Sequence, residues 1–181
     1  MSYDINIYAN ELSPNPISNW MQRLNACDRM AYDLHPEVVF VVGLSGFCPI
    51  KVTMPGRWPF SSRQDYMSGF EMSVSSFDFE TGDIINKQNQ LEAEGIDLGL
   101  WKSFSAQVCI SFNPNNMFEA RLSFLTAAIL TEEFDGICYD PQLGQEMKKS
   151  GVFTWAEKQV KRHDADTKSQ KLVAHPFEGW R

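Results

Sequence analysis

The chain has 181 residues, 43% of them hydrophobic and 22% charged, which suits one soluble globular domain spanning residues 1–181. Its formal net charge of −7 argues against binding to nucleic acid or to anionic membranes, because both need an excess of Lys and Arg. The same charge is compatible with a basic protein partner, since opposite charges speed encounter, but it also serves simply to keep a protein soluble.

The cellular location is inferred from the N-terminus, the apolar stretches and the cysteines. No positive region followed by an apolar run opens the chain, so no secretory signal is visible, and no apolar stretch approaches the ~20 residues of a membrane span. Cys27, Cys48, Cys109 and Cys138 are far apart and form no Cys-x-x-Cys pair. They indicate small buried side chains in a reducing compartment. We therefore expect a cytoplasmic protein.

The chain opens with a predicted strand and helix. Residues 3–9 alternate between apolar and polar side chains, as in a half-buried strand. Asn15 and Pro16 then start a helix, which the His35-Pro36 pair ends. Trp20 falls on the apolar face of this helix, and that spacing favours core packing over a binding platform.

A hairpin is expected next. Residues 38–42, Val-Val-Phe-Val-Val, form a continuous apolar run rich in β-branched side chains, typical of a strand covered on both faces. Residues 47–54 return as a second strand, and Pro49 places this strand, or at least its start, at a sheet edge. Residues 70–75 predict a further half-buried strand. Phe77 and Phe79 have the opposite parity, which indicates a bulge or a twist out of the sheet.

The stretch that organises the chain covers residues 104–144. Residues 104–112 alternate as a strand, and residues 117–130 form an apolar helix. Asn116 and Glu119 resemble a capping box at the start of that helix. Asp135-Gly136 turns the chain into a short strand at residues 137–139, which Pro141 ends.

The remainder is more polar. Residues 84–99 form a surface segment or a loop, anchored by Trp101 and its apolar neighbours. From about residue 150 a short helix carries a buried stripe of Val152, Trp155, Ala156 and Val160, with a polar face in solvent. The final residues either dock through Phe177 and Trp180 or stay loose. The fold class is therefore α+β: an antiparallel or mixed sheet of about five to seven strands with two main helices on one face.

Side chains for metal binding or catalysis form no recognisable set. Of the three histidines, His35, His163 and His175, none lies near a cysteine or a second histidine, so no metal site is predicted. Asp164 and Asp166 beside His163 belong to a charged stretch that we expect to be solvent-exposed. No Gly-x-Ser-x-Gly, Walker or Gly-x-Gly-x-x-Gly motif occurs, and no cofactor is expected.

Protein binding is the function that these patterns favour. The loop with Arg57, Trp58 and Phe60 has the composition of an interaction hot spot, although it could instead fold back to cover the core. Together with the acidic Glu132, Glu133 and Asp135 it makes up the predicted contact set, which would face a basic partner.

Two other functions stay open. A small hydrolase or transferase could be built around Tyr139, Asp140 and a histidine, although Asp140-Pro141 is also ordinary turn chemistry. The chain could also be a structural subunit of a phage or secretion particle, which would show an extended self-association surface.

The segment Gly-Ile-Cys-Tyr-Asp-Pro-Gln at residues 136–142 resembles one that recurs in small cytoplasmic bacterial proteins, many of them immunity proteins of toxin–immunity pairs. The resemblance covers residues 104–145. It implies an α+β protein that binds and blocks a cognate toxin and does no chemistry of its own; with the acidic charge of the chain, we expect that toxin domain to be basic.

Overall fold

The computed structural model describes the chain except for residues 1, 57–62, 81–91, 93–96, 168–174 and 181. Its strands are β1 (Tyr3–Ala9), β2 (Ala31–Leu34), β3 (Ser45–Met54), β4 (Gln64–Ser76), β5 (Ala106–Phe112), β6 (Ile137–Asp140), β7 (Gln145–Lys148) and β8 (His175–Pro176). Its helices are α1 (Pro16–Cys27), α3 (Leu98–Trp101), α4 (Met117–Glu133) and α5 (Val152–Thr167).

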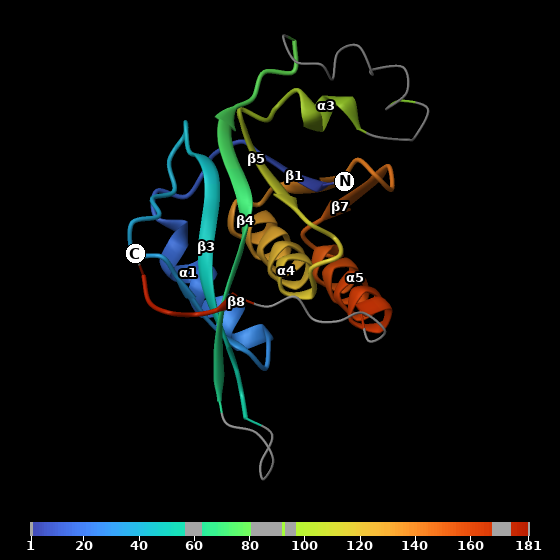
Figure 1. Ribbon diagram of the computed structural model, residues 1–181. Helices are drawn as coiled ribbons and strands as arrows, with labels where there is room; N and C mark the ends of the chain where they lie inside the picture. The colour runs from blue at the N-terminus through green and yellow to red at the C-terminus, as the bar shows by residue number, and fades with distance from the viewer. Residues whose placement is uncertain (1, 57–62, 81–91, 93–96, 168–174, 181) are drawn as a thin grey trace.

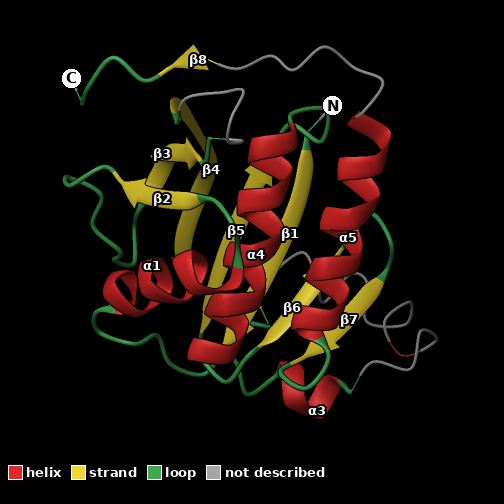
Figure 2. Ribbon diagram, turned by 90° about the horizontal axis from the view of Figure 1, so that it is seen from below, coloured by secondary structure: helices red, strands yellow, loops and turns green. Residues whose placement is uncertain are grey.

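The described strands form one antiparallel sheet. Seven of them follow the order β2-β3-β4-β5-β1-β6-β7, and the short β8 pairs with β4. Figure 2 shows α1, α4 and α5 on one face of this sheet, with α4 between the other two. The helix α3 lies on the opposite side of the sheet from α4 (Figure 1). The structure thus confirms the predicted α+β class and its antiparallel sheet.

The predicted unit at residues 104–144 is present as β5, α4 and β6. Asn116 caps α4 by accepting hydrogen bonds from the backbone nitrogens of Phe118 and Glu119, at 3.0 and 3.3 Å. Glu119 does not complete the expected capping box, because its carboxylate accepts from the backbone nitrogen of Asn113 at 2.9 Å instead. Asp135 turns the chain after α4 with a φ of 48°.

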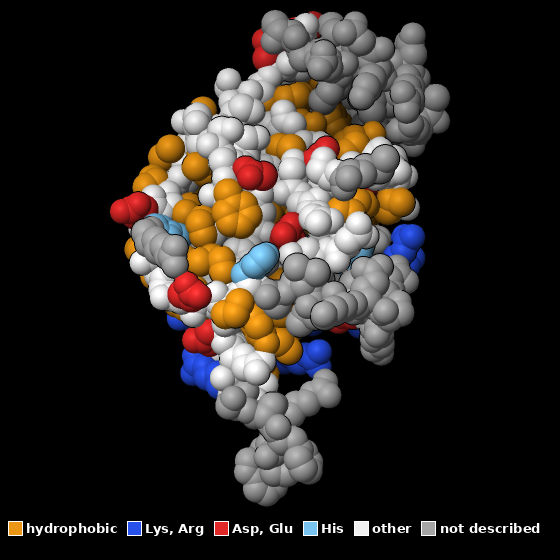
Figure 3. Space-filling view, viewed as in Figure 1, with side chains coloured by type: hydrophobic (Ala, Val, Ile, Leu, Met, Phe, Trp, Pro, Cys, Tyr) orange, Lys and Arg blue, Asp and Glu red, His pale blue; other side chains and the backbone are white. Residues whose placement is uncertain are grey.

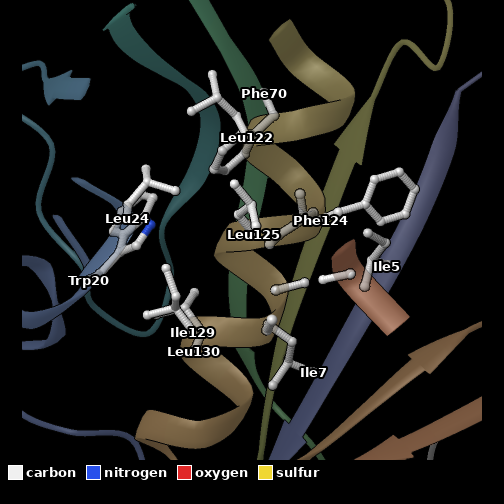
Figure 4. Packing of buried hydrophobic residues seen from close by; sticks show 14 of the residues in the cluster. Ile5, Ile7, Trp20, Leu24, Phe70, Leu122, Phe124, Leu125, Ile129 and Leu130 are labelled. Carbon is white, nitrogen blue, oxygen red and sulfur yellow. The ribbon is translucent and has the colours of Figure 1, made fainter. Parts of the chain in front are cut away.

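The main core lies between α4 and the sheet. Almost the whole of α4 is buried, because the sheet covers one side and α1 and α5 cover its flanks, so its apolar residues run all round the helix. Figure 4 shows Leu122, Phe124 and Ile129 of α4 among Ile5 and Ile7 of β1. Trp20 of α1 is fully buried there and donates to the Thr126 hydroxyl at 3.0 Å, as a core residue rather than a binding platform.

A smaller core lies on the other face of the sheet. It gathers aromatic side chains around Tyr8 and Trp101, whose ring centroids are 4.5 Å apart. Phe77 and Phe79, which follow β4, belong to this cluster, on the face that their parity opposite to Phe70 and Val74 assigns them. The backbone nitrogen of Phe77 donates to the carbonyl oxygen of Ser105, the residue just before β5, at 2.7 Å.

Two predictions near the start of the chain are wrong. The first helix ends at Cys27 rather than at His35-Pro36, and residues 31–34 form β2 against β3. Burial alternates in β2, with Tyr32 and Leu34 inside, and the Asn25 side chain pairs with both backbone groups of Tyr32. Residues 38–42 are not a covered strand but a loop between β2 and β3.

Pro49 lies in the middle of β3, at the end of the half that has one neighbouring strand, as the predicted edge position requires. β2 pairs only with residues 50–53 of β3, so the first half of β3 pairs with β4 alone. The Pro49 carbonyl oxygen accepts a hydrogen bond from the backbone nitrogen of His35, which follows β2. The nitrogen of Pro49 lies on the same side of β3 as this carbonyl and therefore points away from β4, where it would otherwise be missed as a donor. The short β7 strand after residue 144 was missed by the sequence patterns.

The C-terminal residues dock rather than stay loose. His175 and Pro176 pair with Met67 and Tyr66 of β4. The backbone nitrogen of Phe177 donates to the backbone carbonyl oxygen of Asp65 at 3.0 Å. The ring centroids of Trp180 and His35 are 4.9 Å apart. The α5 stripe is also as expected, with Val152, Trp155, Ala156 and Val160 all buried.

Candidate functional site

Residues 38–42, here called the valine loop, expose three β-branched side chains. Val39, Val41 and Val42 are 58%, 51% and 60% exposed, whereas Phe40 between them is buried. Burying a valine side chain stabilises a folded protein by roughly 1.5–3 kcal/mol relative to leaving it exposed. The three exposed valines contribute little of this stabilisation. Stability therefore does not explain this run, and grouped exposed apolar side chains are typical of an interaction surface.

The valine loop is held in place from several sides. The Phe40 ring lies 5.6 Å from the ring of Phe134, which directly follows α4. The backbone N–H of Gly43 donates to the carbonyl oxygen of Val74 at 2.8 Å, and that of Leu44 donates to the carbonyl oxygen of Val41 at 3.0 Å. Gly43 has a φ of +96°, a conformation that lets the chain turn back into β3. The three valines are thus displayed by an anchored loop.

The acidic end of α4 adjoins this loop through Phe134. Glu132 and Glu133 occupy the last turn of the helix, and Asp135 follows it. The carboxyl end of a helix carries a partial negative charge, so each carboxylate there is unfavourable by about 0.3–1 kcal/mol. No basic residue of α4 balances them within that turn. Any partner that balances these carboxylates therefore comes from another element or from another molecule.

The structure brings Glu132, Glu133 and Asp135 together but gives each a partner. Glu132 forms an ion pair with Arg23 of α1, and Glu133 accepts a hydrogen bond from Asn19 of the same helix. Asp135 pairs with Lys149 at 3.1 Å, where its side chain is 81% exposed. The first two carboxylates are therefore held in fixed positions, and Asp135 is the one most open to a partner.

The other half of the predicted contact set, Arg57, Trp58 and Phe60, lies outside the described residues. The sequence patterns did not single out the valine loop as exposed, because an apolar run ordinarily predicts burial. The signals that could have done so were Pro36 and Gly43, which mark turns on both sides of the run.

Two residues of the alternative enzymatic site, Tyr139 and Asp140, face different sides of the sheet. Tyr139 and Asp140 are successive residues of β6, so their side chains face opposite sides of the sheet. Asp140 is fully buried and accepts from the Tyr3 hydroxyl and from the backbone of Gln142 and Leu143. The Tyr139 ring instead lies 5.6 Å from that of Trp101.

The histidines lie in three separate places. His35 contacts Trp180, His175 lies on β8, and the His163 ring is 5.4 Å from that of Phe124. Within the described residues, no three His, Cys, Asp or Glu side chains gather as metal ligands would. In the same part of the chain, none of the helices has the length and apolar character needed to cross a membrane.

One buried charge cluster was also missed by the sequence patterns. Arg121 of α4 bonds through two guanidinium nitrogens to Asp28, at 2.6 and 3.1 Å, and through the third to Asp164, at 2.8 Å. Asp164 is therefore ion-paired and partly buried, not free in solvent as its charged neighbourhood predicts. The cluster joins α1, α4 and α5, and Asp28 also accepts a hydrogen bond from the Tyr32 hydroxyl, so we interpret it as structural.

Comparisons with known proteins add no constraint to these observations. No protein-family model matches the chain, and neither the curated proteins nor the solved structures contain a match. A function therefore has to be argued from the valine loop and the acidic end of α4.

Proposed function

We propose that this chain is a non-enzymatic protein-binding module, most concretely an immunity-type inhibitor that covers a basic toxin domain. The valine loop carries this proposal, because Val39, Val41 and Val42 are exposed on a loop that Phe40 anchors. An apolar surface that is already ordered loses little conformational freedom when a partner binds, which favours affinity.

The acidic end of α4 supplies charge beside this apolar surface. Protein interfaces commonly combine an apolar centre with a polar rim, and the valine loop next to Glu133 and Asp135 has that arrangement. The net charge of −7 favours encounter with a basic partner. Trp58 and its neighbours in the aromatic loop stay part of the predicted contact set.

The choice of an immunity-type partner rests on the resemblance at residues 136–142. This segment begins directly after Asp135, so the part of the chain that carries the resemblance adjoins the acidic end of α4. The cysteines are all free thiols, which fits action in the cytoplasm of the producing cell.

The test is affinity capture with the full chain expressed in its native cell. We compare the wild type with the triple variant V39S/V41S/V42S and with Leu143→Ser, which removes an exposed apolar side chain elsewhere. The wild type and Leu143→Ser should retain one basic protein in a one-to-one complex, and the triple variant should lose it. Co-expression of the chain should relieve the growth inhibition that this partner causes.

Retention of the same partner by the triple variant would remove the valine loop from the interface. A captured partner whose toxicity the chain does not relieve would contradict the inhibitory role. Trp58→Ala, compared in the same assay, reports whether the aromatic loop contributes to the contact.

A further inference from the structure

A cavity of about 500 Å³ opens where β4 and β5 separate. The ladder between these strands ends at the pair Glu71 and Ser111, after which β5 leaves the sheet at Asn113 while β4 continues beside β3. We call this opening the fork cavity. Its volume lies in the range of small-ligand sites. The lining residues are Ser2, Phe47, Phe70, Glu71, Ser111, Phe112, Asn113, Asn115 and Glu119.

The strand register sets four side chains in one row beside the fork cavity. Asp4 of β1 pairs with Ser111 of β5, Ser111 pairs with Glu71 of β4, and Glu71 pairs with Phe47 of β3. Residues paired in this way lie on the same face of a sheet. Two carboxylates, one hydroxyl and one phenyl ring therefore follow one another across four strands, on the face that α4 leaves open.

The Phe47 ring is half exposed and firmly positioned. It lies against the backbone of Gly69, where a Cβ atom would meet its Cζ at 2.7 Å and the Cys48 carbonyl oxygen at 2.2 Å. Only glycine leaves room for the ring at this place. The result is a fixed aromatic surface at the mouth of the fork cavity.

The carboxylates differ in how they are used. Glu119 is occupied, since its oxygens accept from Asn113 and from the Asn116 side chain at 2.9 and 2.8 Å. Asp4 accepts from the Ser111 hydroxyl at 2.6 Å. Within the described part of the chain, neither an ion pair nor a hydrogen bond engages the Glu71 carboxylate, and none of the described lining residues is Lys or Arg. The fork cavity thus carries uncompensated negative charge beside a phenyl ring.

Figure 3 looks onto this end of the sheet and shows acidic side chains beside exposed hydrophobic ones. The blue Lys and Arg side chains lie towards the lower and right-hand edges of the same view. An organic cation is the ligand that such a surface recognises, because a phenyl face and a carboxylate both attract positive charge.

We propose that the fork cavity binds an organic cation, an ammonium or guanidinium group that lies over the Phe47 ring with its charge against Glu71. The site lies by the first turn of α4, whereas the valine loop lies by its end. Those ends are about 26 Å apart over 17 residues, so this site does not depend on the proposed function.

Calorimetric titration of the full chain tests the proposal with named probes. N-Acetylarginine amide and 1,4-diaminobutane are free cations, an acetylated and amidated Gly-Arg-Gly peptide carries the same guanidinium on a longer chain, and N-acetylcitrulline amide is the neutral analogue of N-acetylarginine amide. We expect the cations to bind and N-acetylcitrulline amide not to bind. Tighter binding of the peptide would identify a protein-borne arginine as the ligand, and tighter binding of the free cations would identify a small molecule.

Matched variants locate the binding. Glu71→Gln and Phe47→Leu should each weaken cation binding by about tenfold, whereas Glu11→Gln, an exposed carboxylate elsewhere, should leave it unchanged. Thermal unfolding of each variant shows that it is folded. Absence of binding by all cationic probes, equal binding of N-acetylcitrulline amide, or unchanged affinity in folded Glu71→Gln would overturn the proposal.

Discussion

Arg121 lies between Asp28 and Asp164 with only 12% of its side chain exposed, so its charge depends on these partners rather than on water. Burial alone would raise the pKa of the Asp28 carboxyl. Hydrogen bonds from Arg121 and from the Tyr32 hydroxyl outweigh that effect and hold the pKa below its ordinary value of 3.8. Ionised Asp28 therefore stabilises the folded chain.

Asp28→Asn is expected to lower the free energy of unfolding by about 3–5 kcal/mol at neutral pH, because it leaves Arg121 without its main partner. A carboxyl whose pKa is lowered on folding contributes stability above its unfolded pKa and loses it as the pH falls through the folded value. The difference between wild type and variant should therefore shrink below about pH 4. Denaturant unfolding across this range measures it.

The control for this prediction is Asp78→Asn, at an exposed aspartate outside the cluster. It should match the wild type across the whole pH range. A gap between wild type and Asp28→Asn that stays constant down to pH 2 would show that the Asp28 charge does not contribute in the way described.

Gly136 is the first residue of the segment that resembles immunity proteins. Close packing against β1 explains why this position is a glycine. A Cβ atom at this position would lie 2.2 Å from the Tyr8 carbonyl oxygen of the neighbouring β1 strand. Gly136→Ala should therefore destabilise the chain by about 1–3 kcal/mol. Gly151→Ala is the matched control, since its nearest neighbour, the Lys148 carbonyl oxygen, is 4.0 Å away. Equal midpoints in thermal unfolding would contradict the prediction.

At the scale of elements, the valine loop contains one buried residue that we expect to support the fold and three exposed residues that we propose contact a partner. Phe40 packs on Phe134, so Phe40→Ala should lower the free energy of unfolding by about 3–5 kcal/mol. The three valines are exposed, so replacing each by serine should change it by no more than about 0.5 kcal/mol. Chemical denaturation of the four single variants tests this contrast, and a large loss in any valine variant would show that its side chain supports the fold.

Elements with long periodic patterns could be predicted from the sequence. β5 and α4 carry seven and 17 residues of regular pattern, and α1 and α5 each present a clear apolar stripe. β2 and β7 have only four residues each, too few for a pattern to stand out. These two segments are strands because they pair with β3 and β6, and such pairing cannot be read from four residues alone.

At the scale of the whole molecule, the fold leaves one sheet face partly open and places two unlike surfaces at opposite ends of α4. The acidic residues of the predicted contact set could be chosen from composition, but their partners within the chain could not. Glu132 and Glu133 are held by Arg23 and Asn19, which lie more than 100 residues earlier in the chain. The exposure of the valine loop likewise could not be predicted from the sequence, because an apolar run by itself predicts burial. Only the tertiary structure determines which short apolar runs remain exposed to solvent.

The central claim is that the valine loop contacts a basic protein partner in the cell. Photo-cross-linking tests it directly, with benzoylphenylalanine in place of Val41 and, as a control, in place of the exposed Lys161 on α5, which lies near Arg121 in the first half of α4. We predict a single major adduct with a basic protein from position 41 and none from position 161. No adduct from position 41, or the same adducts from both positions, would contradict the account.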